Sequence, residues 1–243
     1  MQDFIDLANY MADEAGKIIR PYYRQAVEVD HKGDESPVTI ADRSVEERLR
    51  AIIEEKRPDD GIIGEEFGNK ESKNQYEWVL DPIDGTKSFV IGRPIFGTLI
   101  ALCENNIPVL GIIDQPITKE RWLGAQGQPT TLNGRIIATR KCPDLNQTRI
   151  ASTAPTFLDQ WQELQKACDF LSWGGDCYSY GLVANGGLDA VIETGLNAYD
   201  LAALPPIIEG AGGWIGNWQG EVLTSQSKNN VLAIGNPALK DRF

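Results

Sequence analysis

The sequence predicts a mixed α/β protein, with an α+β N-terminal half and an α/β C-terminal half. Two amphipathic helical patterns come first, residues with strand composition follow up to about residue 140, and strands then alternate with helices. With 42% apolar and 24% charged residues, the composition is that of a globular protein. The 243 residues can bury a substantial core. We expect two lobes, residues 1–143 and 144–243, that share one site.

The N-terminal elements are two helices separated by a polar stretch. Apolar residues such as Phe4, Leu7 and Met11 recur at helical spacing over residues 3–25, and residues 40–57 repeat this pattern before Pro58. Between them, "VDHKGDESPVT" (29–39) predicts a loop or a hairpin. The stretch "DGIIGEEFGN" (60–69) then predicts a short strand that runs into a turn.

The remaining chain divides into a strand-rich block and an alternating one. We expect an antiparallel sheet from "YEWVLD", "FGTLIALCEN", "NIPVLGIIDQP" and "RWLGAQG" (76–127). Further strands are predicted at 148–153, 188–195 and 230–237, and helices at about 157–171 and over 199–213. In the last helix, Pro205 and Pro206 should disturb the second turn.

Charge and residue counts exclude several classes of function. The formal net charge of −12 repels a phosphate backbone, so we expect no nucleic-acid partner. No run approaches the roughly 20 apolar residues that span a bilayer, and the N-terminus does not resemble a secretory signal, so we expect a cytoplasmic protein. The four cysteines form no CxxC pair and should be reduced and mostly buried. His31 is the only histidine, which disfavours histidine-rich zinc sites and serine–histidine triads.

Carboxylates beside turns are the candidates for chemistry. Taken singly, each has an ordinary explanation: Asp42 and Asp200 could cap helices, and Asp84-Gly85 is a common turn. Taken together with Glu65 and Asp81, they offer the oxygen ligands that Mg²⁺ prefers. The combination therefore indicates a metal site.

The stretch "LDPIDGT" (80–86) carries the strongest signal. Asp81 and Asp84 project from one tight turn, in which the carbonyl of Ile83 can also face an ion. Backbone N–H groups of Gly85 and Thr86 can hold a phosphate oxygen, especially at the start of a helix. Such a site suits phosphoester hydrolysis by metal-activated water, with Glu65 bridging metals or acting as general base.

"LDPIDGT", an upstream "GEE" and a downstream "YD-LAA…EGAGG" together resemble the inositol monophosphatase superfamily of Mg²⁺-dependent, lithium-sensitive phosphatases. The resemblance runs nearly end to end and implies a layered αβαβα sandwich, with the metals between the two halves, and commonly a homodimer. It implies that two or three Mg²⁺ ions are bound by a set of five ligands: Glu65, Asp81, the Ile83 carbonyl, Asp84 and Asp200.

The same resemblance implies roles for the neighbouring residues. Gly85 and Thr86 match the groups that hold phosphate, and Thr86 with Asp42 matches the pair that helps to activate the nucleophilic water. Glu193, seven residues before Asp200, matches the residue that contacts the alcohol portion of the substrate. Lys32 resembles a lysine near the mobile loop by the metals, although a solvated loop lysine is an equal alternative.

Four further stretches, "DGTKSF", "GTLIAL", "GIIDQP…RW" and "WGGDCYSY", resemble the histidinol-phosphate phosphatase branch. L-Histidinol carries an ammonium group and an imidazole, which Asp176 and Glu193 could bind, with Tyr178 or Tyr180 nearby. Core or interface packing is the competing explanation of these tyrosines. Two alternatives stay open: a phosphatase of inositol, sugar or nucleotide phosphates, and a catalytically silent metal- or ligand-binding regulator.

Overall fold

The computed structural model describes residues 1–25, 29–31, 37–155 and 158–243, and the side chains of these residues except 29–31, 37–38 and 158–160. Lys32 and its predicted role lie outside the described residues. Two helices, α1 (Gln2–Tyr22) and α2 (Ile40–Lys56), are connected through the hairpin of β1 (Val29–His31) and β2 (Pro37–Thr39). The helical and hairpin predictions for this region are confirmed.

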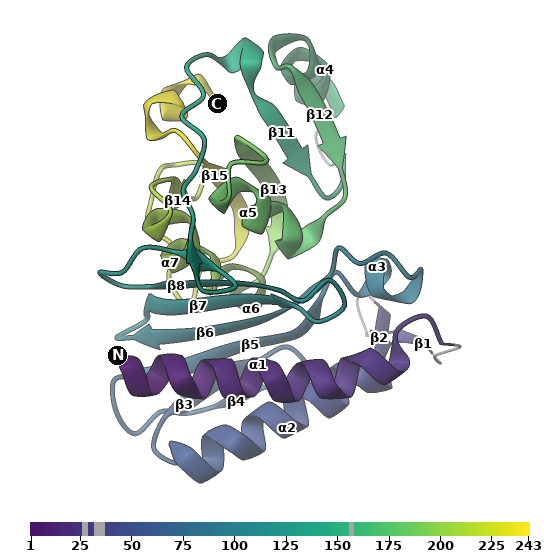
Figure 1. Ribbon diagram of the computed structural model, residues 1–243, viewed down its shortest axis with the longest axis vertical. Helices are drawn as coiled ribbons and strands as arrows, with labels where there is room; N and C mark the ends of the chain where they lie inside the picture. Colours follow the sequence, from purple (N-terminus) through teal and green to yellow (C-terminus); the bar gives the residue numbers. More distant parts are fainter. Residues whose placement is uncertain (26–28, 32–36, 156–157) are drawn as a thin grey trace.

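The N-terminal half forms an eight-stranded sheet, and α1 and α2 cover one of its faces (Figure 1). Its strand order is β10 (Arg135–Ile136), β9 (Thr131–Leu132), β8 (Glu120–Ala125), β7 (Ile107–Gln115), β6 (Gly97–Glu104), β5 (Tyr76–Asp84), β3 (Gly61–Gly64), β4 (Asn69–Lys70). The antiparallel sheet predicted over residues 76–127 is confirmed for β5 to β8, and β3 is added to it by parallel pairing with β5. The chain passes from β4, on one side of β3, to β5 on its other side.

The C-terminal half forms a five-stranded mixed sheet. Its order is β12 (Phe170–Trp173), β11 (Arg149–Ser152), β13 (Ala190–Leu196), β15 (Asn229–Ile234), β14 (Trp214–Gly216). Strand β11 is parallel to both of its neighbours, and β15 is antiparallel to both of its own. Helix α4 (Leu158–Ala167) ends before β12, so the helix predicted to reach residue 171 is shorter than expected. Short 3-10 turns lie at Leu145–Gln147 and Pro237–Arg242.

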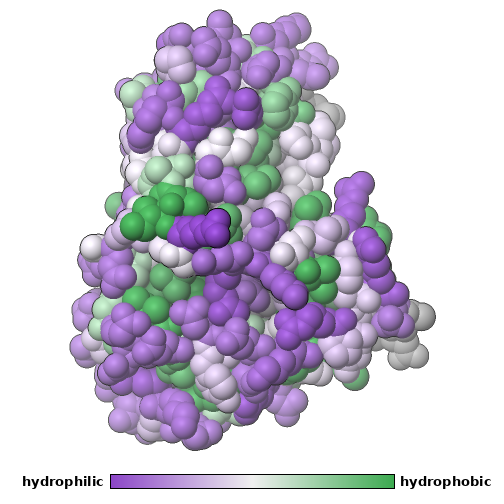
Figure 2. Space-filling model, in the orientation of Figure 1, coloured by the Kyte–Doolittle hydropathy of each residue, from purple (hydrophilic) through white to green (hydrophobic). Residues whose placement is uncertain are grey.

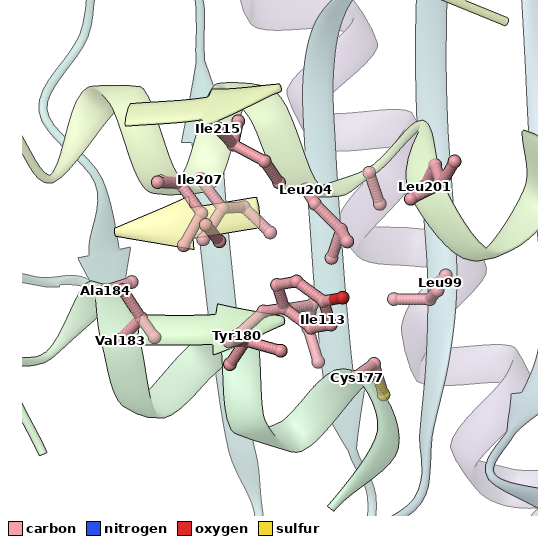
Figure 3. Packing of buried hydrophobic residues seen from close by; sticks show 14 of the residues in the cluster. Leu99, Ile113, Cys177, Tyr180, Val183, Ala184, Leu201, Leu204, Ile207 and Ile215 are labelled. Carbon is pink, nitrogen blue, oxygen red and sulfur yellow. The ribbon is translucent and has the colours of Figure 1, made fainter. Parts of the chain in front are cut away.

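Helices α5 (Asp176–Ala184), α6 (Ala198–Leu201) and α7 (Leu204–Gly210) lie between the two sheets. Figure 3 shows Leu99 and Ile113 of the large sheet facing Val183 of α5 and Leu204 and Ile207 of α7. On the far face of the small sheet, Leu164 of α4 packs against buried strand residues. The order of layers is therefore helix, sheet, helix, sheet, helix, as the sequence predicts.

The helix predicted over residues 199–213 is interrupted. It divides into α6 and α7, with Pro205 and Pro206 in the first turn of α7. At these positions a proline costs the helix no hydrogen bond, because the first N–H groups of a helix have no intrahelical partner. Asp200 lies in α6, before the break.

The face of the molecule shown in Figure 2 is largely hydrophilic. In the view of Figure 2, hydrophilic residues dominate and hydrophobic residues form small separate groups. All four cysteines are free and buried, as predicted. Among the described residues, no helix is long and apolar enough to cross a membrane.

Candidate active site

The end of β5 brings two acids to one side of the sheet. In a regular strand, residues three apart point to opposite faces. Here Asp81 pairs with Leu99 but Asp84 pairs with Gly97, so one extra residue is accommodated in β5 as a bulge. Pro82 lies within this bulge, and its carbonyl accepts a hydrogen bond from Thr98 Oγ1 at 2.8 Å.

A third acid joins this pair from the C-terminal half. Asp81, Asp84 and Asp200 each offer a carboxylate oxygen within 4.8 Å of the others. Asp200 is the third residue of α6, and its Oδ2 accepts the backbone N–H of Asn197 at 2.6 Å. Asp84 Oδ2 accepts the backbone N–H of Cys177, in the first turn of α5, at 2.5 Å. One oxygen of each of these two acids is thus bound by a helix start.

The parallel pairing of β3 with β5 places Glu65 beside the cluster. Gly64 is paired with Leu80, so the residues that follow them, Glu65 and Asp81, lie side by side. The carboxylate of Glu65 contributes to raising the pKa values of Asp81, Asp200 and Asp42. Glu65 therefore lies close to all three.

The electrostatics of the cluster favour a bound cation. Burial, followed by the charges of Glu65, Asp84 and Asp200, raises the pKa of Asp81 well above its usual value. Burial and the nearby Asp176 and Asp200 do the same to the pKa of Asp84, and burial raises that of Asp200 to about 6. In the part of the chain that the structure describes, Asp81 Oδ1 is buried without a hydrogen-bond partner.

Hard divalent cations prefer such oxygen donors, and a cation would relieve both the mutual repulsion and the unpaired oxygen. The residues present therefore fit a metal ion of the Mg²⁺ type.

The hydroxyl of Thr86 lies at the rim of the cluster. Gly85 has φ of 83°, which turns the chain from β5 into α3 (Thr86–Val90). Thr86 Oγ1 lies 3.1 Å from the Ile83 carbonyl oxygen and 3.4 Å from Asp42 Oδ1, so its single proton can serve either acceptor. The Ile83 carbonyl thus points towards Thr86.

Asp42 combines a capping role with this contact. It is the third residue of α2, and its Oδ2 accepts the backbone N–H of Thr39 at 2.8 Å and the Thr39 hydroxyl at 2.5 Å. The ordinary explanation that Asp42 and Asp200 cap helices holds as well, because both accept the N-cap N–H from the third helical position. An acid there uses one oxygen for the cap and keeps the other for a neighbour.

A cavity of about 290 Å³ adjoins the acids. Its lining includes Asp84, Asp176, Glu193 and Asp200, which brings the predicted substrate acids and two cluster acids to one pocket. Asp176 Oδ2 accepts the hydroxyl of Ser88 at 2.9 Å. A Cβ added at Gly85 would lie 2.7 Å from the same oxygen, so only glycine fits opposite Asp176.

Glu193 is held on both of its oxygens. Oε1 accepts the backbone N–H of Thr153 at 2.8 Å, and Oε2 accepts the Tyr180 hydroxyl at 2.6 Å. Thr153 also links the two substrate acids, because its hydroxyl accepts the backbone N–H of Asp176. Neither the contact of Tyr180 with Glu193 nor that of Thr153 could be read from the sequence. Tyr178 instead bonds Glu120 and lies outside the pocket lining.

Comparison with known proteins agrees with this geometry. The model of the inositol monophosphatase family matches residues 1–242. The chain belongs to the inositol monophosphatase family. Similar proteins include the bifunctional phosphatase IMPL2, chloroplastic, of Arabidopsis thaliana, 46% identical over 95% of this chain and 68% of that protein. The histidinol-phosphatase of Chlorobaculum parvum is 34% identical over 96% of each chain.

Solved structures agree as well. An inositol monophosphatase from Zymomonas mobilis shares 47% identity and superposes with a TM-score of 0.90, covering 99% of this chain and 96% of that chain. The resemblance stated from the sequence is confirmed, and this member of the inositol monophosphatase family is a metal-dependent phosphatase. Of the acids singled out in the sequence, Asp81, Asp84 and Asp200 form one cluster, and Asp176 and Glu193 line the adjoining cavity.

Proposed function

We propose that this phosphatase hydrolyses L-histidinol phosphate to L-histidinol and phosphate. The observation that carries the proposal is the presence of Asp176 and Glu193 in one pocket with Asp84 and Asp200. The alcohol portion of the substrate would carry an ammonium group and an imidazole, and two acids beside the reacting phosphate match those groups in charge. The name of the Chlorobaculum parvum relative supports the same substrate.

The proposed metal ligands are Glu65, Asp81, the Ile83 carbonyl, Asp84 and Asp200, which would hold two or three Mg²⁺ ions. When bound, the metal would polarise the phosphoryl group of the substrate and lower the pKa of a bound water. The buried, mutually repelling acids and the unpaired Asp81 Oδ1 support this assignment.

The other residues orient the reactants. Gly85 and Thr86 would donate backbone N–H groups to the phosphate at the start of α3. The hydroxyl of Thr86, paired with Asp42, would orient the attacking water, since Asp42 is itself fixed by Thr39. Attack in line with the leaving oxygen then needs no covalent intermediate, and the departing alcohol lies towards Asp176 and Glu193.

A second candidate keeps the chemistry and changes the ester. The 47% identical structure from Zymomonas mobilis is an inositol monophosphatase, and the Arabidopsis relative is named as bifunctional. An inositol phosphate, or a broader set of sugar and nucleotide phosphates, is therefore the alternative substrate class. The cluster of Asp81, Asp84 and Asp200, with carboxylate oxygens within 4.8 Å of one another, disfavours a catalytically silent regulator.

The test is phosphate release, with Mg²⁺, from histidinol phosphate, inositol 1-phosphate and 3′-phosphoadenosine 5′-phosphate in parallel. We expect a preference for histidinol phosphate that is lost in Asp176→Asn and in Glu193→Gln. Asp84→Asn should lose activity on every ester. A preference for another ester would refute the substrate and keep the metal site, and no turnover of any ester would support the silent regulator. Lithium sensitivity, a homodimer, a cytoplasmic location and a role in histidine biosynthesis stay predictions.

A further inference from the structure

A fully buried acid outside the site binds the loop that carries Glu65. Glu46 of α2 has no solvent-exposed surface. Its Oε2 accepts the backbone N–H of Glu66 at 2.7 Å, and its Oε1 accepts the backbone N–H of Phe67 at 3.2 Å. Arg50, one helical turn later, donates Nε to the same Oε1 at 2.7 Å. Both oxygens of Glu46 therefore accept hydrogen bonds from the loop, and Oε1 accepts from Arg50 as well.

Arg50 extends this contact to the end of the loop. Its second guanidinium nitrogen donates to the carbonyl oxygen of Gly68. The loop approaches so closely that a Cβ added at Gly64 would lie 1.9 Å from Glu46 Oε1. Glu46 and Arg50 thus hold the backbone of residues 66–68, directly after Glu65, and Glu46 also lies closely against Gly64, directly before it.

Apolar packing does not hold the loop in place of these hydrogen bonds. Phe67 is 52% exposed, and a Cβ added at Gly68 would meet nothing within 4 Å. Hydrogen bonds to a buried charged group are stronger than neutral ones and leave a costly unpaired group when broken. The pairing of Ile63 with Asn69 closes the loop at its base, and the hydrogen bonds from α2 hold the backbone of residues 66–68 within it.

We infer that Glu46 and Arg50 form a positioning pair that holds Glu65 towards Asp81 and thereby sets the affinity of the site for divalent cations. The inference rests on the proposed role of Glu65 as a metal ligand. The pair touches neither substrate nor metal and acts through the backbone of residues 66–68. Groups that orient metal ligands in this way change metal affinity about 10- to 100-fold when they are removed.

The test is Glu46→Gln, which keeps the shape but places an NH₂ group against one of the donors. We expect the dissociation constant for Mg²⁺, measured by calorimetry on metal-depleted protein, to rise about 10-fold or more. Amide hydrogens of Glu66 and Phe67 should exchange faster, and kcat should recover at high Mg²⁺. Arg50→Lys, which keeps the charge but loses the fork, should give a smaller rise of the same kind.

Asp60 is the matched control. It is buried and also accepts on both oxygens, from Arg57, Asn74 and the indole of Trp78, but at the opposite end of β3. Asp60→Asn imposes the same chemical change away from the loop. We expect it to lower the melting temperature and leave the Mg²⁺ dissociation constant unchanged.

Glu65→Gln distinguishes the proposed metal-ligand role of Glu65 from the positioning role of Glu46 and Arg50. If Glu65→Gln leaves Mg²⁺ binding unchanged, the proposed metal role of Glu65 is wrong, and the positioning role is overturned with it. If Glu65→Gln weakens binding but Glu46→Gln and Arg50→Lys do not, only the positioning pair is overturned. An equal loss of Mg²⁺ affinity in Asp60→Asn would also overturn it, because general destabilisation would then explain the effect.

Discussion

Replacing Asp200 by asparagine should stabilise the metal-free protein while abolishing its response to Mg²⁺. Burial raises the pKa of Asp200 from 3.8 to about 6. That difference corresponds to about 3 kcal/mol of unfavourable free energy when the carboxylate is ionised in the folded state. Asparagine keeps an acceptor for the Asn197 N–H, and the stronger bond of that N–H to the charged oxygen is already included in this difference, because it lowers the pKa of Asp200. The expected net gain at pH 8 is therefore about 3 kcal/mol.

The stability difference between Asp200→Asn and the wild type depends on pH. Because the folded-state pKa is raised, the wild-type protein bears no penalty below the unfolded value of 3.8, and bears the full penalty above about 6. The advantage of Asp200→Asn should therefore be near zero at pH 4 and largest above pH 7. For a chain of this size, about 3 kcal/mol is a rise of about 6–12 °C in melting temperature.

Thermal and denaturant unfolding, with and without Mg²⁺, is the assay. Mg²⁺ at 100 times its dissociation constant should stabilise the wild type by about 2.7 kcal/mol and the variant by little. The control is Asp59→Asn, whose side chain is 65% exposed and which should change stability by less than about 0.5 kcal/mol at any pH. A metal-free Asp200→Asn protein that is no more stable than wild type at pH 8 would refute the electrostatic account of the cluster.

Two further predictions concern the pocket and the packing between the sheets. Tyr180→Phe removes the hydroxyl that donates to Glu193 Oε2, so KM for the preferred ester should rise about 10-fold while the Mg²⁺ dissociation constant stays unchanged. Steady-state kinetics measures KM, and calorimetry measures the dissociation constant. An unchanged KM would contradict a substrate role of Tyr180 and Glu193. Gly111→Ala places a Cβ 1.9 Å from the Ala203 carbonyl oxygen, so the contact of β7 with the start of α7 must open. We expect a loss of about 3 kcal/mol in unfolding free energy, and denaturant titration giving a loss under 1 kcal/mol would show that the layers pack less tightly than described.

The sequence indicated the acids because their neighbours are informative. Asp81 and Asp84 flank Pro82 in a turn that ends a strand, and Gly85 supplies the left-handed conformation that starts α3. Such local signals depend on backbone stereochemistry, which acts between residues close in the chain. Helical periodicity likewise identified α1 and α2, since their buried faces repeat at the helical period.

Contacts between segments far apart in the chain left no local signal in the sequence. The parallel pairing of β3 with β5, which places Glu65 beside Asp81, joins strands that could equally have paired antiparallel. The helix α5 over Asp176–Ala184 was not predicted, because its hydrophobic residues lie on several sides between the two sheets and leave no single apolar face.

The sequence by itself determined which residues can bind a hard cation and a phosphate, because carboxylate chemistry and turn geometry belong to short segments. Only the tertiary structure decided that Asp200 meets Asp81 and Asp84, that Tyr180 and Thr153 hold Glu193, and that Glu46 grips the loop of Glu65. These contacts join residues 13 to 119 positions apart. They form because burying the layers forces the elements together, a constraint of the whole core rather than of any local stretch.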